Sequence, residues 1–128
     1  MNRHQARETA FKIIFQLEAG DIPIEDAKMH ALEGRAASDF CLELVDGVLE
    51  NRAELDEIIS ARLHQWTLER MAKMDRSLLR LALYEMLYIE DVPTTVTINE
   101  AVELAKTYGD DESSKFVNGL LSNVAKEQ

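Results

Sequence analysis

The stretch that decides the fold is TVTINEAVELAKTYGDDESSKFVNGLLSN, which runs from Thr95 to Asn123. Apolar residues recur at helical spacing on both sides of Gly109, and this pattern predicts two amphipathic helices joined at that glycine. Pro93 precedes the first helix, with Thr94 or Thr95 available as N-cap. The acidic run after Gly109 suits the positive N-terminal end of the second helix, where a nearby serine can serve as cap.

Helical patterns continue through the rest of the chain. The first three expected helices are separated by Gly20 to Pro23 and by Gly34. A packed connector is expected at Trp66-Thr67-Leu68. The expected earlier helices cover residues 3–18, 24–32, 53–63 and 70–89, together with one capped by Ser38 that runs to about Leu49. No internal repeat or linker divides the sequence, so we expect an all-α fold of about seven helices and a single domain over residues 1–128.

The longest expected helix, residues 70–89, is apolar on most of its circumference, which indicates a central helix that neighbours contact from several sides. Its polar side chains form one stripe, which fits either a solvated face or a protein interface. The stripe consists of Lys73, Ser77, Arg80, Tyr84 and Tyr88, with Arg76 and Glu85 beside it.

The chain has 128 residues and a formal net charge of −10 at pH 7, which argues against a general nucleic-acid binder because phosphates are repelled on average. No apolar run is long enough to span a bilayer, and cationic residues interrupt the N-terminus where a signal peptide would be apolar. The single Cys41 lies in an apolar stretch. We therefore expect a buried thiol and a cytoplasmic, reducing location.

The charge is unevenly distributed. Residues 1–16 carry three cationic side chains, those of Arg3, Arg7 and Lys12, against the single carboxylate of Glu8. A basic end on an acidic body suits a local RNA contact beside a separate protein-binding surface. An ordinary solvated helix start is the alternative interpretation.

Catalytic and metal-binding patterns are scarce. The sequence has no phosphate-binding glycine loop, CxxC, HExxH or nucleophile elbow, and its three histidines, His4, His30 and His64, are scattered. We therefore expect no enzyme activity, no metal and no cofactor. One alternative remains, since NRAELDEIISARLHQW (residues 51–66) loosely resembles a helix of small all-α chorismate mutases.

Five motifs follow one another along the chain. They are Ala6-Arg7-Glu8-Thr9-Ala10, the run Leu42 to Val48, RSLLRLALYEM (residues 76–86), DVPTTVTINEAVELAK (residues 91–106) and SSKFVNG (residues 113–119). In this order they resemble the NusB family of bacterial transcription antitermination factors over nearly the whole chain. The resemblance implies two packed helical subdomains. It also implies binding to boxA-type RNA of ribosomal RNA leaders, to a small-subunit ribosomal protein (the Nus-E component) and to the RNA polymerase antitermination complex, with a homodimer possible.

Site residues follow from the same resemblance. Arg3, His4 and Arg7 align with an RNA-contacting patch that Lys115 joins, whereas Phe15 and Glu85 match positions that face the ribosomal protein. Tyr84 and Tyr88 lie off the main apolar face of their helix, as Phe11 and Phe15 do in the first, so we assign both tyrosines to the protein-facing surface too.

Two further expectations concern the class of protein and its packing. A related module occurs as the N-terminal part of ribosomal RNA cytosine methyltransferases. The chain ends at Gln128 without a cofactor-binding α/β domain, which favours a free-standing factor.

Gly119, within a predicted helix, is expected to mark a close helix contact that leaves no room for a side chain.

Overall fold

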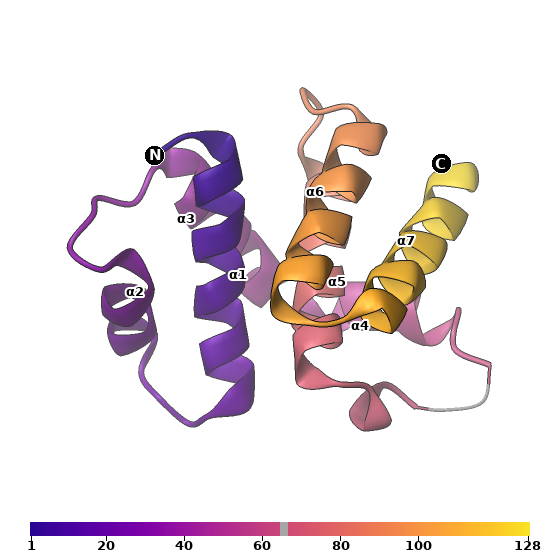
Figure 1. Cartoon of the computed structure of the whole chain (residues 1–128), viewed down its shortest axis with the longest axis horizontal. Coiled ribbons are helices and arrows are strands. Elements are labelled where there is room, and N and C mark those ends of the chain that lie inside the picture. The colour runs from indigo at the N-terminus through magenta and orange to yellow at the C-terminus, as the bar shows by residue number, and fades with distance from the viewer. Residues whose placement is uncertain (65–66) are drawn as a thin grey trace.

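The computed structural model describes residues 1–64 and 67–128, and within these ranges it contains seven α-helices, one short 3₁₀ helix and no strand (Figure 1). The all-α prediction is confirmed. The elements are α1 (Arg3–Ala19), α2 (Ile24–Leu32), α3 (Asp39–Glu50), α4 (Arg52–Ser60), η1 (Leu68–Arg70), α5 (Lys73–Tyr88), α6 (Thr94–Tyr108) and α7 (Asp111–Lys126).

At the majority of helix ends, the predicted bound differs from the observed one by one to three residues. The expected connector lies partly outside the described residues, because Trp66 is not described, and Leu68 begins η1. Ser38 caps α3 as predicted by accepting a hydrogen bond from the Cys41 amide. Two caps differ. Pro93 precedes α6 without a side-chain cap, and Asp110 rather than a serine caps α7.

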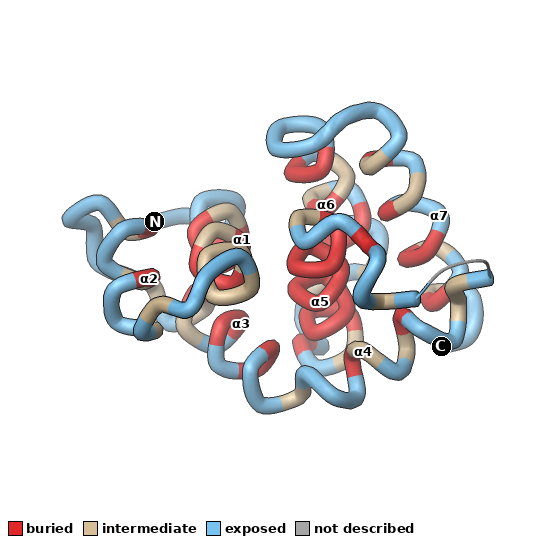
Figure 2. The backbone as a smooth tube through the Cα atoms, turned by 90° about the horizontal axis from the view of Figure 1, so that it is seen from below, coloured by how far each residue is buried: buried red, intermediate tan, exposed pale blue. Residues whose placement is uncertain are grey.

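Helix α5 is the centre of the molecule. Twelve of its residues are buried, and it contacts α1, α3, α4, α6 and α7. Figure 2 shows its buried turns enclosed by the other helices. The prediction of a central helix is therefore confirmed, and a single change in this helix can affect both halves of the chain.

Two groups of helices meet along α5. Helices α1, α2 and α3 pack together on one side, and α6 and α7 form an antiparallel pair on the other, with α4 crossing nearby (Figure 1). The first group contacts α5 through α1 and α3. Helix α1 therefore lies at the junction of the two groups, so its side chains can contact elements of both.

Glycines mark where helices come closest, but not at the expected position. A Cβ atom built on Gly47 would lie 2.0 Å from Cζ of Tyr84, so the Tyr84 ring of α5 packs directly on the α3 backbone there and would have to shift to admit a side chain. At Gly119, no heavy atom of the described residues lies within 4 Å of such a Cβ. The expected close contact at Gly119 is wrong, because this face of α7 is open.

The thiol of Cys41 is buried, as the sequence predicts. Burial raises its pKa, although the charges of Arg35 and Lys28 oppose that shift. A buried thiol with a raised pKa carries little thiolate at neutral pH and is unreactive.

Candidate functional site

The first turn of α1 presents the most exposed part of the basic N-terminus. Asn2 and Gln5 form a capping box that fixes the start of the helix. The guanidinium of Arg3 lies 4.3 Å from the centre of the Phe40 ring and pairs with Asp91 at 3.2 Å. Both partners of that ion pair are about half exposed or more, so it is weak and replaceable. Arg3 is therefore held over an aromatic ring while its charge faces solvent.

His4 lies beside Arg3 and contacts α6. Its Nδ1 lies 2.7 Å from Oε2 of Glu100. This hydrogen bond and the charge of Glu100 raise the pKa of His4, which favours the protonated ring. The structure thus brings Arg3 and His4 together as exposed side chains at the start of α1, one of them cationic and the other with a raised pKa.

Arg7 is placed differently from its sequence neighbours. It is 5% exposed, and its Nε and Nη2 donate to the two carboxylate oxygens of Glu85 at 2.8 and 2.9 Å. Glu85 is 1% exposed and also accepts a 2.6 Å hydrogen bond from the Thr97 hydroxyl. The expectation that Arg7 and Glu85 lie on separate binding surfaces is wrong in placement, because the two residues form one buried pair.

Lys115 is exposed, as expected for a phosphate contact. It belongs to α7, and α6 lies between α7 and α1, which carries Arg3 and His4 (Figure 1). The structure therefore separates the expected RNA patch into two sites.

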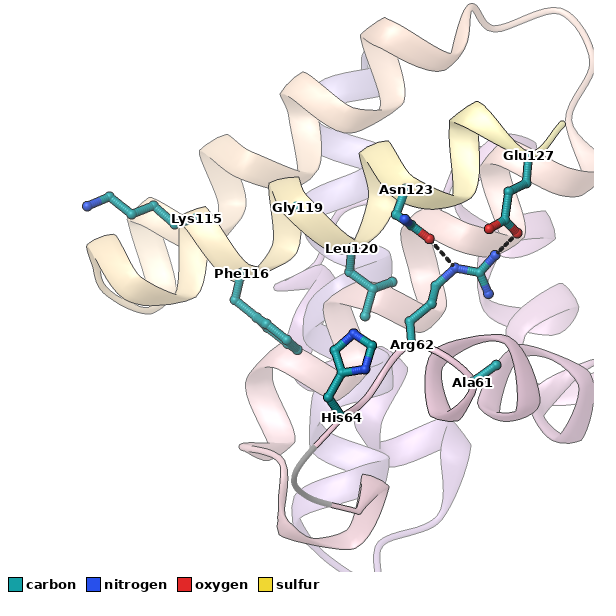
Figure 3. Close-up of a pocket in the computed structure, with 9 residues that line it drawn as sticks. All are labelled: Ala61, Arg62, His64, Lys115, Phe116, Gly119, Leu120, Asn123 and Glu127. Carbon is teal, nitrogen blue, oxygen red and sulfur yellow. Dashed lines mark hydrogen bonds and ion pairs between the residues drawn. The ribbon is translucent and has the colours of Figure 1, made fainter.

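The second site is an open pocket of about 540 Å³ between the end of α4 and α7. Figure 3 shows Lys115 at its edge, directed outward, with Phe116 and His64 facing one another across the opening. Arg62 lies inside, where it donates to Asn123 at 3.0 Å and pairs with Glu127. Gly119 is exposed and also lines this pocket.

A third surface surrounds Tyr84 and Tyr88 on the α3 side of α5. The two rings stack with centroids 5.0 Å apart. Tyr84 is 8% exposed because its ring covers Gly47, whereas Tyr88 is 40% exposed and its hydroxyl donates to Glu54. Of the four expected protein-facing residues, Tyr88 offers the largest exposed aromatic surface on α5.

Carboxylates surround this tyrosine pair. We call the exposed residues Glu43, Asp46, Glu50 and Glu54 the acidic stripe, and no cation among the described residues pairs with them. Burial and the nearby charges of Glu43 and Glu50 raise the pKa of Tyr84. A hydrogen bond to Glu54 raises the pKa of Tyr88 as well. This surface has uncompensated negative charge beside an exposed ring.

The two phenylalanines of α1 have different surroundings. Phe11 is 2% exposed and packs 5.2 Å from the ring of Tyr108, so its expected position off the core face is wrong. Phe15 stacks on Phe11 at 6.0 Å and is only partly buried. Phe15 therefore remains available on the surface, apart from the tyrosine pair.

The charged side chains of the chorismate mutase-like stretch, Arg52, Asp56 and Arg62, do not line a common pocket. Arg52 and Asp56 belong to ion pairs with Glu18 and Arg80, whereas Arg62 faces α7. The described residues contain no group of metal-ligating side chains, and none of their helices is long and apolar enough to cross a membrane.

Comparison with known proteins agrees with the motifs and the helical arrangement. Residues 4–126 match the NusB family. The chain belongs to the NusB family. Transcription antitermination protein NusB of Bacillus subtilis (strain 168) is 50% identical over 127 residues, which are 99% of this chain and 97% of the relative. The protein of the same name from Bacillus velezensis is 51% identical over 124 residues, 97% of this chain and 95% of that one.

Solved NusB structures have the same fold. The structure of T. maritima NusB superposes with a TM-score of 0.89 at 39% identity, covering 100% of this chain and 93% of the other. A crystal structure of antitermination factors NusB and NusE in complex with dsRNA superposes with a TM-score of 0.88 at 27% identity. The match covers 98% of this chain and 97% of that one.

Within this NusB-family chain, sequence reasoning missed several residues that shape the candidate surfaces. Phe40 and Glu100 support Arg3 and His4, and Arg62 and His64 line the pocket beside Lys115. Each contacts residues far away in the sequence, so no local pattern reports the contact. The only available signal was residue type, a cation or an aromatic near a predicted helix end.

Proposed function

We propose that this chain is a transcription antitermination factor that binds boxA-type RNA together with a small-subunit ribosomal protein, within the RNA polymerase antitermination complex. The observation that carries this proposal is the near-full-length identity, about half of all positions, to curated antitermination proteins. A solved relative in complex with NusE and dsRNA supports both kinds of partner. The proposed function is binding, and no residue is assigned a catalytic role.

Arg3 and His4 are the proposed RNA contacts at the start of α1. An RNA phosphate can replace Asp91 as the partner of Arg3, since that ion pair is solvent-exposed. A phosphate can also bind the His4 ring, whose pKa is raised by Glu100. Lys115 is a separate proposed contact on α7, on the other side of α6 from α1, which suits an extended strand rather than a compact one.

The proposed protein-facing surface is the tyrosine pair with its acidic stripe. An exposed aromatic ring among polar groups has the composition of a binding hot spot, and unpaired carboxylates steer a basic ribosomal protein towards it. Phe15 is a second proposed anchor on α1. Glu85 is not assigned to this surface, because burial removes it from reach.

The protein surface is tested with Tyr88→Ala, which removes the exposed ring. We expect affinity for the ribosomal protein to fall about tenfold or more, because truncation of a hot-spot tyrosine costs on the order of 2 kcal/mol. Tyr88→Phe is the control, since it loses the hydroxyl bonded to Glu54 but retains the ring. Equal affinities for all three proteins, measured by calorimetry, would place the partner elsewhere.

The whole function is tested by in vitro transcription through a terminator that follows a boxA-containing leader. We expect read-through when this chain, the ribosomal protein and the other antitermination factors are present, and less read-through when this chain is left out. Equal read-through with and without the chain contradicts the proposal.

A further inference from the structure

The N-terminal end of α1 contains a cationic residue that does not face solvent. Three cations, Arg3, Arg7 and Lys12, lie on this helix, but Arg7 directs its guanidinium inward to Glu85. The space beside the pair is about 10 Å³, the minimum that a single water requires. A guanidinium bound to two carboxylate oxygens in so closed a site cannot reach an RNA phosphate without breaking a buried ion pair.

Arg7 nevertheless touches the supports of both exposed residues. Its guanidinium lies 5.3 Å from the centre of the Phe40 ring, on which Arg3 rests at 4.3 Å. Its Nη1 lies 3.9 Å from Oε1 of Glu100, whose other oxygen holds His4 at 2.7 Å. Arg3 and His4 are thus each linked to Arg7 through one intermediate side chain.

Glu85 fixes the position of Arg7 from the other side. A bidentate pair sets both the distance and the plane of the guanidinium, and the Thr97 hydroxyl holds the carboxylate from α6. We propose that the buried Arg7–Glu85 pair is a positioning device that holds Arg3 and His4 in place for RNA, through Phe40 and Glu100, without touching the RNA. This inference rests on the proposed RNA surface at the start of α1.

The distinguishing variant is Glu85→Gln, tested as the complex with the ribosomal protein on a boxA-type oligoribonucleotide. If Arg7 were an RNA contact, loss of the opposing carboxylate would free it and tighten binding. If the pair positions Arg3 and His4, binding weakens, about tenfold for one misplaced contact. The two interpretations therefore predict effects of opposite sign.

Glu18→Gln is the matched control. Like Glu85→Gln, it removes one carboxylate charge from a largely buried ion cluster that joins α1 to α5, so it alters net charge and stability comparably. Glu18 lies at the opposite end of α1 from Arg3 and His4. We expect its RNA affinity to equal that of the unmodified protein. Should Glu85→Gln fail to fold by circular dichroism, Thr97→Val takes its place, because it removes only one hydrogen bond to Glu85.

A second readout does not require RNA. In Glu85→Gln, Arg7 loses its nearest carboxylate and turns towards Glu100, which lowers the pKa of His4 from its raised value. The NMR titration of His4 should show this decrease in Glu85→Gln and not in Glu18→Gln.

The outcomes separate this inference from the proposed function. The positioning role is overturned if Glu85→Gln leaves RNA affinity unchanged or raises it while Arg3→Ala lowers it. If Arg3→Ala also binds RNA normally, the proposed RNA surface is wrong, and an unchanged His4 pKa in Glu85→Gln then overturns the positioning role as well.

Discussion

At the scale of single residues, sequence patterns identified which side chains carry charge or aromatic surface, but not which way they point. Arg7 and Glu85 each lie on a stripe that the sequence allows to face solvent, yet they bind one another across 78 positions. The sequence around each residue does not reveal the buried pairing of two charges, since an arginine or a glutamate taken alone is typical of a surface position. Cys41, which lies among apolar neighbours, was correctly expected inside.

The sequence also does not show which glycines lie at a close contact between helices, and the two placements seen in the structure predict opposite effects of alanine. Gly47→Ala should destabilise the domain by about 1–3 kcal/mol, because the new methyl group overlaps the Tyr84 ring and displaces it from its packed position. Gly119→Ala should stabilise it by up to about 1 kcal/mol, since that position is exposed, helical and open. Urea unfolding monitored by circular dichroism measures both, and a destabilised Gly119→Ala protein would contradict the open face of α7.

At the scale of elements, helix existence and approximate bounds could be predicted because periodicity and caps are local properties. The placement of the helices relative to one another could not be predicted. The sequence does not show that α6 separates the start of α1 from Lys115, so one expected RNA patch became two. The central position of α5 was predictable, because a helix that is apolar nearly all round must be covered on every side.

Three arginines connect helices at the C-terminal end of α1. Glu18 pairs with Arg52 of α4 and with Arg76 and Arg80 of α5. Burial alone would raise the pKa of Glu18, but the hydrogen bonds and charges of Arg80 and Arg76 outweigh it and lower that pKa. The cluster therefore stabilises the contact of α1 with α4 and α5 while Glu18 is ionised.

This cluster predicts a pH dependence. A carboxylate whose pKa is lower in the folded state contributes stability above its unfolded pKa, and that contribution is lost as pH falls through the folded pKa. Glu18→Gln should thus lower the free energy of unfolding at pH 7, by about 3 kcal/mol, and the difference from the unmodified protein should shrink below about pH 4. Thermal unfolding at several pH values checks it. A constant difference across this range would show that the charge of Glu18 is not what stabilises the contact.

At the scale of the whole molecule, the net charge of −10 and the small exposed basic surface set the character of RNA binding. The proposed RNA contacts, Arg3, His4 and Lys115, are few and lie on an acidic body, so the isolated chain should hold RNA weakly. In the proposed complex, a basic ribosomal protein bound at the acidic stripe would add positive charge and RNA contacts of its own. RNA binding is therefore expected to be a joint property of the two proteins.

The most direct test of this account is the affinity of a fluorescent boxA-type RNA for the chain alone and for the chain with the ribosomal protein. We expect weak binding by the chain alone and binding tighter by at least about tenfold with the partner. In both cases affinity should fall as salt rises from about 50 to about 200 mM. Equal affinities with and without the partner, or binding that does not change with salt, would contradict it.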